Sequence, residues 1–224
     1  ERFERRLSLH AVALNGGRPD EATALSESIR ELQPDSSFHL RLRALSAMYG
    51  DGDRPAGERA VAALGVARAR DARESWLNTC VRAQWQLSTG ESEPSMPPAR
   101  TVRDRSAAER VCDATLESMR AVQQRDPSAR EAMDRLEDLV RSGVAEFFMG
   151  DGHLDYATIA LARLREQSGD RPGALAALRY RPYFIGWQPF LAASLRDEGR
   201  LAADVGDRDG AIRAYEHYLA LRHN

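Results

Sequence analysis

The residues that could carry out chemistry are few and scattered. None of the five histidines lies at the H-E-x-x-H spacing of a zinc site or next to a cysteine: His10, His39, His153, His217 and His223. The acidic runs at 50–53 and 150–155 begin like calcium-binding loops but lack the remaining ligands and the closing glutamate. The chain also has no G-x-S-x-G motif and no glycine-rich phosphate loop. We therefore expect no catalytic residue, no cofactor and no metal, and we predict that the protein is not an enzyme.

The charged residues exclude further classes of protein. All 32 basic residues are arginines, so this chain has neither a Schiff-base lysine nor a phosphate-loop lysine. The 34 acidic residues bring the net charge to −2, which argues against binding of nucleic acid through this region. The longest uncharged run, 182–195, holds fourteen residues with two prolines and is too short to span a bilayer. We expect no nucleic-acid partner and no membrane insertion by this region.

Signals for the cellular compartment are weak. The chain begins with Glu1 instead of methionine, so we expect a processed product or a fragment of a longer protein. Its start shows no charged region followed by an apolar core, as a signal peptide would, and we predict a cytoplasmic location. An extracytoplasmic location is the alternative if a transmembrane segment precedes this region. Cys80 and Cys112 lie 32 positions apart, and we predict two buried free thiols unless the fold brings them together.

Short glycine motifs recur where helices would have to turn. The run GDRPGAL at 169–175 recurs 37 residues later as GDRDGAI at 206–212, and looser copies lie at 16–22 and 52–55. Glycine can end a helix with left-handed backbone, and proline fits the first turn of the next helix. These runs therefore predict corners between consecutive helices.

Between the corners, apolar residues repeat with helical spacing, as Leu154, Ala157, Leu161 and Leu164 do. No window alternates apolar and polar residues as a strand would, so we expect an all-α protein. The predicted helices span residues 2–15, 19–32, 36–49, 56–69, 71–88, 103–125, 128–149, 153–168, 172–180, 189–205 and 208–222.

One segment interrupts this pattern. Residues 88–102 contain three prolines and no apolar period, which is typical of a loop or linker. We therefore divide the chain into N-terminal helical repeats at 1–87, a Pro- and Ser-rich loop or linker at 88–102, and C-terminal helical repeats at 103–224.

The C-terminal corner resembles a tetratricopeptide repeat (TPR), a unit of two antiparallel helices with small residues where they cross. The small positions and one aromatic position of that repeat are occupied here by Gly199, Ala202, Ala211 and Tyr215. Glu198 departs from the pattern, because the family prefers leucine at its position. Residues 1–34 match less closely, and between the two ends the likeness is one of architecture alone.

A longer stretch, from Tyr180 to Arg222, is similar to the terminal helical-repeat region of large bacterial signalling proteins, including protein kinases and transcriptional activators. These resemblances imply a TPR-like stack of antiparallel helix hairpins that forms a right-handed superhelical solenoid. They also imply a non-catalytic scaffold or sensor module that binds a protein or peptide within a larger bacterial regulatory protein. The alternative is a sensor domain that holds a small molecule or signal peptide inside the superhelix.

Tetratricopeptide folds bind through a concave groove that the first helix of each pair lines. Carried onto this chain, the groove positions include Tyr156, Arg163, Arg196 and Arg200. Guanidinium groups bind carboxylates through two parallel hydrogen bonds, so an acidic protein or peptide would suit this groove. The alternative is that these arginines are solvated or pair with neighbouring acidic residues.

Aromatic residues gather before the last predicted hairpin. Five of the chain's fifteen aromatic residues lie within 180–190, where prolines prevent one continuous helix. Either a long loop tucks these rings beneath the hairpin, or Trp187 is an exposed anchor for a partner. Trp187 therefore joins the candidate partner-binding residues.

Overall fold

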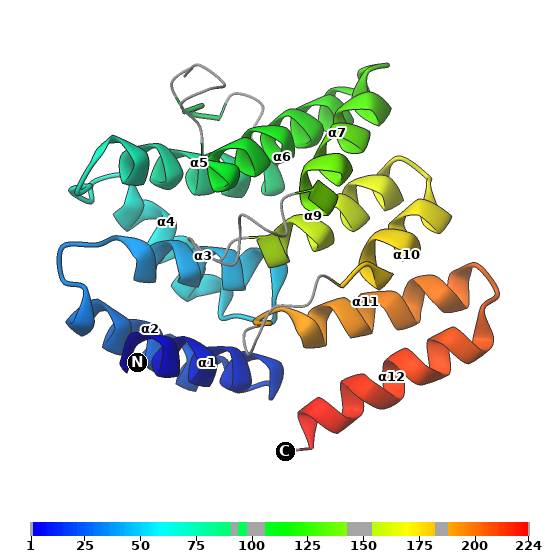
Figure 1. Ribbon diagram of the computed structural model, residues 1–224, viewed down its shortest axis with the longest axis horizontal. Coiled ribbons are helices and arrows are strands. Elements are labelled where there is room, and N and C mark those ends of the chain that lie inside the picture. The colour runs from blue at the N-terminus through cyan, green and yellow to red at the C-terminus, as the bar shows by residue number, and fades with distance from the viewer. Residues whose placement is uncertain (1, 91–93, 98–105, 143–153, 182–187, 224) are drawn as a thin grey trace. The chain divides into compact units, whose positions relative to one another are not determined.

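The computed structural model describes residues 2–90, 94–97, 106–142, 154–181 and 188–223, and every regular element within these ranges is an α-helix (Figure 1). The all-α prediction is confirmed for this part of the chain. Within each of its two units, most helices that follow one another in sequence pack against one another. None of the described helices is both long and apolar enough to cross a membrane.

The chain divides into two compact units, residues 1–99 with 185–192 and residues 100–184 with 193–224. The first unit contains helices α1 (Arg2–Asn15), α2 (Pro19–Leu32), α3 (Phe38–Tyr49), α4 (Arg54–Leu64) and α5 (Ala72–Ser88). Within it, α1 packs on α2, α2 on α3, α3 on α4, and α5 on both α3 and α4. Contacts between neighbours in sequence are typical of helical-repeat proteins.

Aliphatic and aromatic residues together form a core cluster in the first unit. Ile29, Phe38 and Leu42 form a buried cluster against which Phe3 and Leu7 pack. Residues 188–192 are joined to this unit by the side-chain amide of Asn15. That amide donates to the carbonyl of Gln188 at 2.7 Å and accepts from the N–H of Ala192 at 2.9 Å.

The second unit contains α6 (Ala107–Gln124), α7 (Ala129–Ser142), α9 (Leu154–Gln167), α10 (Arg171–Arg179), α12 (Arg208–Arg222) and, from Ala193 onward, α11 (Leu191–Asp204). α6 packs on α7, both pack on α9, and α9 packs on α10. α6 begins with a capping box, in which Ser106 and Glu109 each accept a hydrogen bond from the other's main-chain N–H.

The two close copies of the glycine motif form the same corner. Gly169 and Gly206 end α9 and α11 with φ angles of +84° and +83°, which an L-residue rarely adopts. The next residues, Asp170 and Asp207, cap α10 and α12 by accepting the N–H of a glycine three positions on, at 2.9 Å in both cases. A Cβ on either of those later glycines would clash with the capping carboxylate. Both glycines of the motif therefore have a structural purpose.

The sequence prediction is wrong at one helix end that matters below. The helix predicted at 56–69 is α4, which begins at Arg54 and ends at Leu64. Gly65 closes the helix, and the next helix starts only after Asp71 accepts the N–H of Glu74 as its N-cap. Residues 65–71 therefore form a link instead of a last helical turn.

The prediction of two free thiols is also wrong. The structure contains no free cysteine, and both Cys80 and Cys112 are disulfide-bonded. Sequence spacing gave no information on whether the fold would bring either sulfur to a partner.

The C-terminal hairpin shows the close helix crossing that the small residues predict. A Cβ on Gly199 would lie 2.9 Å from the ring of Tyr215, so α11 and α12 approach one another where glycine leaves room. Ala202 on α11 is fully buried, whereas its neighbour Ala203 is exposed.

We expect Ala202→Leu to lower the free energy of unfolding by about 1–3 kcal/mol, because a larger side chain overpacks a filled interface. Ala203→Leu adds the same atoms at an exposed site and should change stability by less than about 0.5 kcal/mol. Urea denaturation followed by circular dichroism measures both variants. Equal effects of the two substitutions would show that the buried face of α11 has been misidentified.

Candidate functional site

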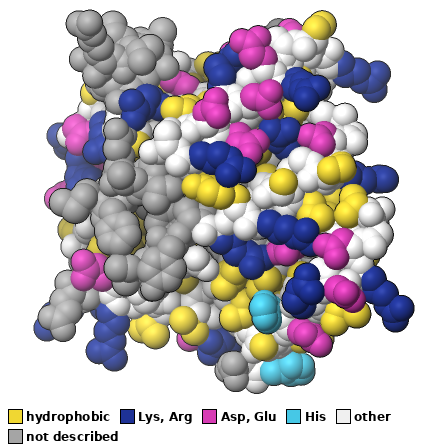
Figure 2. Space-filling view, turned by 45° about the vertical axis from the view of Figure 1, so that its right-hand side comes forward, with side chains coloured by type: hydrophobic (Ala, Val, Ile, Leu, Met, Phe, Trp, Pro, Cys, Tyr) yellow, Lys and Arg dark blue, Asp and Glu magenta, His cyan; other side chains and the backbone are white. Residues whose placement is uncertain are grey.

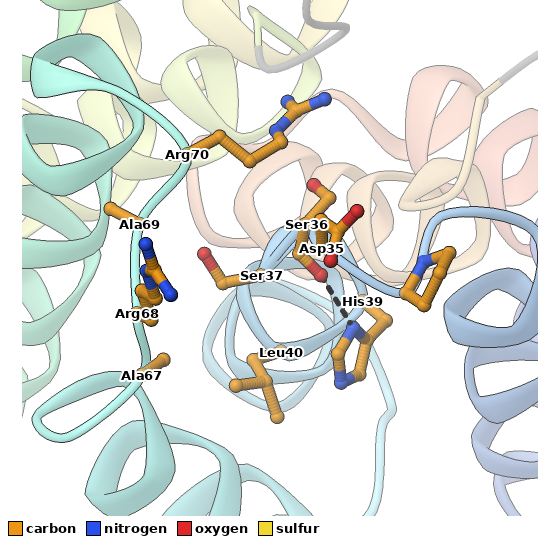
Figure 3. Close-up of a pocket in the computed structure, with 10 residues that line it drawn as sticks. Asp35, Ser36, Ser37, His39, Leu40, Ala67, Arg68, Ala69 and Arg70 are labelled. Carbon is orange, nitrogen blue, oxygen red and sulfur yellow. Dashed lines mark hydrogen bonds between the residues drawn. The ribbon is translucent and has the colours of Figure 1, made fainter.

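A cleft opens in the first unit between two links that join its helices (Figure 3). Residues 34–37 of the α2–α3 link and the first turn of α3 form one wall, and residues 67–70 of the α4–α5 link form the other. The cleft has a volume of about 620 Å³. Its lining residues are Pro34, Asp35, Ser36, Ser37, His39, Leu40, Ala67, Arg68, Ala69 and Arg70.

The carboxylate of Glu74 accepts hydrogen bonds from both links. Its side chain is 3% exposed, and its Oε1 accepts hydrogen bonds from the Ser36 hydroxyl at 2.8 Å and the Ser37 N–H at 3.0 Å. Its Oε2 accepts from the N–H of Arg70 at 2.8 Å and from Arg70 Nε at 3.3 Å. One side chain at the start of α5 therefore binds both walls of the cleft.

The electrostatics of Glu74 follow from these contacts. Burial alone would raise the pKa of this carboxyl, because a charge is costly away from water. Hydrogen bonds from Arg70, Ser36 and Ser37, together with the charge of Arg41, outweigh burial and lower the pKa of Glu74 to about 2. Glu74 is therefore ionised at neutral pH and is a poor proton donor.

A second layer of polar side chains supports the carboxylate. Arg41 on α3 is 3% exposed, and its Nη1 lies 3.5 Å from Glu74 Oε1. The same nitrogen donates to Asn78 Oδ1 at 2.7 Å, and Asn78 Nδ2 donates to the Ser37 hydroxyl at 2.8 Å. Buried polar groups that satisfy one another restrict movement, so this network holds both walls of the cleft in place.

The rim of the cleft carries three charged side chains, of which only Arg70 is paired with Glu74. Arg68 and Asp35 are exposed, and neither forms an ion pair within the described part of the chain. Arg70 is half exposed, and its terminal nitrogens have no hydrogen bond to any described residue. In Figure 3, Arg68 and Arg70 come from one wall and Asp35 from the other. The two arginines can therefore bind an acidic group of a ligand, and Asp35 can bind a hydrogen-bond donor.

His39 also lines the cleft but is buried. Its Nδ1 lies 3.2 Å from the carbonyl of Ser36, which favours the tautomer that donates to this oxygen. Burial lowers the pKa of His39, and the Ser36 carbonyl opposes this effect. The neutral ring thus helps to shape the wall and adds no charge to it at neutral pH.

None of the aromatic residues that the TPR resemblance and the aromatic cluster predict to contact a partner is exposed within the described part of the structure. Tyr156, predicted to face a partner, is 3% exposed because α9 packs on α6, α7 and α10. Trp187, the predicted aromatic anchor, lies outside the described residues. Of the same aromatic cluster, Phe190 is buried in the first unit, and the ring of Tyr180 in the second unit lies beneath Arg141, 4.5 Å from its guanidinium carbon.

The three predicted arginines do come together, but acidic residues lie between them. Arg163 Nη2 is 3.5 Å from Asp197 Oδ2, and Arg196 Nε is 3.3 Å from Asp197 Oδ1. Arg200 binds both oxygens of Glu166 at 2.6 and 2.7 Å, and this contact lowers the pKa of Glu166. Each arginine of this strip has an acidic partner, which is the alternative that the sequence left open.

Charges of both signs also alternate over the face drawn in Figure 2, where basic and acidic side chains lie interspersed. No group of three or more His, Cys, Asp or Glu residues that could hold a metal ion occurs among the residues described.

Sequence reasoning missed the cleft. Two local signals were present, the adjacent serines at 36–37 and an aspartate three residues before Glu74. The cleft depends on the end of α4 at Leu64, which frees residues 67–70 to form one wall. The sequence pattern instead predicts a helix that continues to residue 69, and such a helix would leave no wall there.

The comparisons with known proteins identify no relative. No protein-family model matches this chain, and neither a curated protein nor a solved structure matches it.

Proposed function

We propose that this chain is a non-catalytic, TPR-like helical-repeat module that binds a protein or peptide through the cleft between the α2–α3 and α4–α5 links. The observation that carries the proposal is a cleft of about 620 Å³ whose two walls are both hydrogen-bonded to Glu74 and whose rim carries Arg68, Arg70 and Asp35. Walls held in place reduce the entropy lost on binding, and rim charges give specificity. The bacterial signalling context and the superhelical arrangement of the hairpins remain parts of this proposal that rest on the resemblance.

A non-catalytic role agrees with the chemistry of the cleft. Glu74 is ionised and fully hydrogen-bonded, so it has neither a proton to donate nor a free lone pair directed at a substrate. The hydroxyls of Ser36 and Ser37 are hydrogen-bonded to Glu74 and Asn78, and a carboxylate with a pKa of about 2 is too weak a base to activate Ser36 as a nucleophile.

A small-molecule sensor is the second candidate. The volume of the cleft lies within the range of about 300–1,000 Å³ that small-ligand pockets occupy. However, the lining has few large apolar side chains, whereas small-ligand pockets are mostly apolar. We therefore place peptide binding first.

The disulfide-bonded cysteines give information on the cellular compartment of the protein. Disulfides persist in oxidising environments and are rare in the cytosol, so the bonded cysteines favour the extracytoplasmic alternative over the cytoplasmic location. Fractionation of the source cells tests this point, and recovery of the protein with the cytoplasm would contradict it.

The cleft can be tested with a library of displayed random peptides selected on the immobilised wild-type protein. We expect Ala69→Trp, which fills the cleft, to weaken binding of the selected peptide by at least about 10-fold, because the indole occupies its site. Ala203→Trp is the matched control, since it adds the same side chain at an exposed position on the arginine strip of the second unit. Loss of binding in the control alone would show that the peptide binds at the arginine strip instead of the cleft. Both variants must keep the wild-type melting temperature.

A further inference from the structure

We infer that the cleft recognises a single carboxylate on its peptide, with Arg68 and Arg70 holding the carboxylate and Asp35 receiving a hydrogen-bond donor. This inference rests on the proposed function and names the chemistry of the ligand. Arg68 and Arg70 are two positions apart on the same wall, separated by the small side chain of Ala69. A guanidinium group matches a carboxylate through two parallel hydrogen bonds.

One of the two guanidiniums is held in place before any ligand binds. Arg70 Nε lies 3.3 Å from Glu74 Oε2, while its main-chain N–H donates to the same oxygen. This contact uses Nε and leaves the terminal nitrogens for a ligand. A side chain that is already ordered loses less entropy on binding, so Arg70 is suited to positioning the carboxylate.

The net charge of the cleft favours a monoanion. Behind the lining residues, Glu74 lies between Arg41 and Arg70, and its charge offsets that of the buried Arg41. At the rim, Arg68 and Arg70 contribute two positive charges and Asp35 one negative charge, which leaves a single positive charge. A carboxylate neutralises this charge, whereas a doubly charged phosphate group would leave an excess negative charge and be repelled more strongly by Asp35.

Asp35 can fix the orientation of the ligand in the cleft. Its exposed carboxylate stands on the wall opposite the two arginines and accepts hydrogen bonds only. A peptide has N–H groups close to any carboxylate that it carries, so one group can meet the arginines while another meets Asp35. An anion without a donor lacks the second contact.

The arginine strip of the second unit, formed by Arg163, Arg196 and Arg200, is less suited to binding a ligand carboxylate. Arg200 already binds both oxygens of Glu166, so a ligand carboxylate would have to displace a bidentate partner. The rim arginines of the cleft have no such competitor among the described residues, except the Glu74 contact at Arg70 Nε.

Two sources can supply the carboxylate, an acidic side chain or the C-terminus of the peptide. The selected peptide is therefore synthesised with a fluorescent N-terminal label in four forms, with each acidic side chain kept or replaced by its amide, and with a free or amidated C-terminus. We expect the form without any carboxylate to bind at least about 10-fold more weakly than the best form, as expected for the loss of a charged hydrogen bond. The form that retains affinity with only one carboxylate identifies the source.

The same titrations with variants assign the contact to its residues. Arg68→Ala should weaken the best form about 10-fold, whereas Arg208→Ala, at an exposed arginine on α12, should leave it unchanged. Arg68→Glu should reverse the preference, so that the peptide with lysine in place of its acidic residue binds better than the acidic form. Because Arg68 is exposed and contacts no described partner, these variants are expected to fold as the wild type does.

Each outcome decides a different claim. Equal binding of all four peptides, or unchanged binding by Arg68→Ala and Arg68→Glu, would overturn the carboxylate inference. If Ala69→Trp still abolished binding in that case, the proposed function would stand without it. Competition by free glutamate or inorganic phosphate at the concentration of the peptide would show that a small anion is sufficient, and would overturn recognition of a peptide carboxylate.

Discussion

Glu74→Ala is expected to lower the free energy of unfolding by about 3–5 kcal/mol, because it leaves a buried guanidinium without its carboxylate. Arg41 is 3% exposed, and the hydroxyl of Ser36 and the N–H groups of Ser37 and Arg70 would lose their acceptor at the same time. Urea denaturation at neutral pH measures the loss.

Two further variants make this prediction specific. Glu58→Ala removes an exposed glutamate from a pair with Arg54 at 3.5 Å and should cost less than about 1 kcal/mol. Replacing both buried charges, in Glu74→Leu with Arg41→Met, should recover part of the stability lost in the single variants, because the buried guanidinium is removed together with its carboxylate. The recovery is incomplete, since the donors at Ser36, Ser37 and Arg70 still lack their acceptor. A loss below about 1 kcal/mol for Glu74→Ala would mean that the network does not hold the two links together.

The protein is expected to lose about 2–3 kcal/mol of stability between pH 6.5 and 4.5, owing mainly to His10. This residue on α1 is 1% exposed, and its Nδ1 has no hydrogen-bond partner among the described residues. Burial, and secondly the charge of Arg43, lower the pKa of His10 to about 4. Over this pH range the unfolded chain takes up a proton that folded His10 cannot accept, so the free energy of unfolding falls as the pH falls.

Other titrating groups set the limits of this experiment. Burial lowers the pKa of His39 as well, which adds an effect of the same sign. The pKa values of Glu27 and Glu74 are lowered by their partners, so those carboxylates add a loss of stability that begins near about pH 5 and grows at lower pH.

A pair of histidine variants isolates the effect. His10→Leu should flatten the pH dependence of stability measured by urea denaturation, whereas His217→Leu, at an exposed position on α12, should leave it unchanged. The same slope in His10→Leu as in the wild type would assign the acid sensitivity to another group.

The sequence predicts the helices well where their signals are local. The ends of α1, α2 and α12 agree with the predicted ranges 2–15, 19–32 and 208–222, because glycine corners, a first-turn proline and capping residues lie at those ends. The corner at Gly169 is likewise confirmed, since both the left-handed glycine and the aspartate cap lie within the motif.

The candidate site could not be predicted in the same way. The contacts of Glu74 with Ser36, Ser37 and Arg41 span 33 to 38 positions, and no local pattern encodes such pairings. Tyr156 was assigned to an exposed groove because the repeat's helix faces were transferred by analogy, whereas packing of α9 on three helices buries it.

The central claim, that the cleft of the first unit is the binding site, is tested most directly by NMR with an isotopically labelled protein. The selected peptide is titrated in, and the amide resonances are followed residue by residue. We expect the largest shifts at Ser36, Ser37, Arg68, Ala69 and Arg70, with the same dissociation constant at each. Saturating shifts at Arg163, Arg196 and Arg200, with the cleft resonances unmoved, would contradict it.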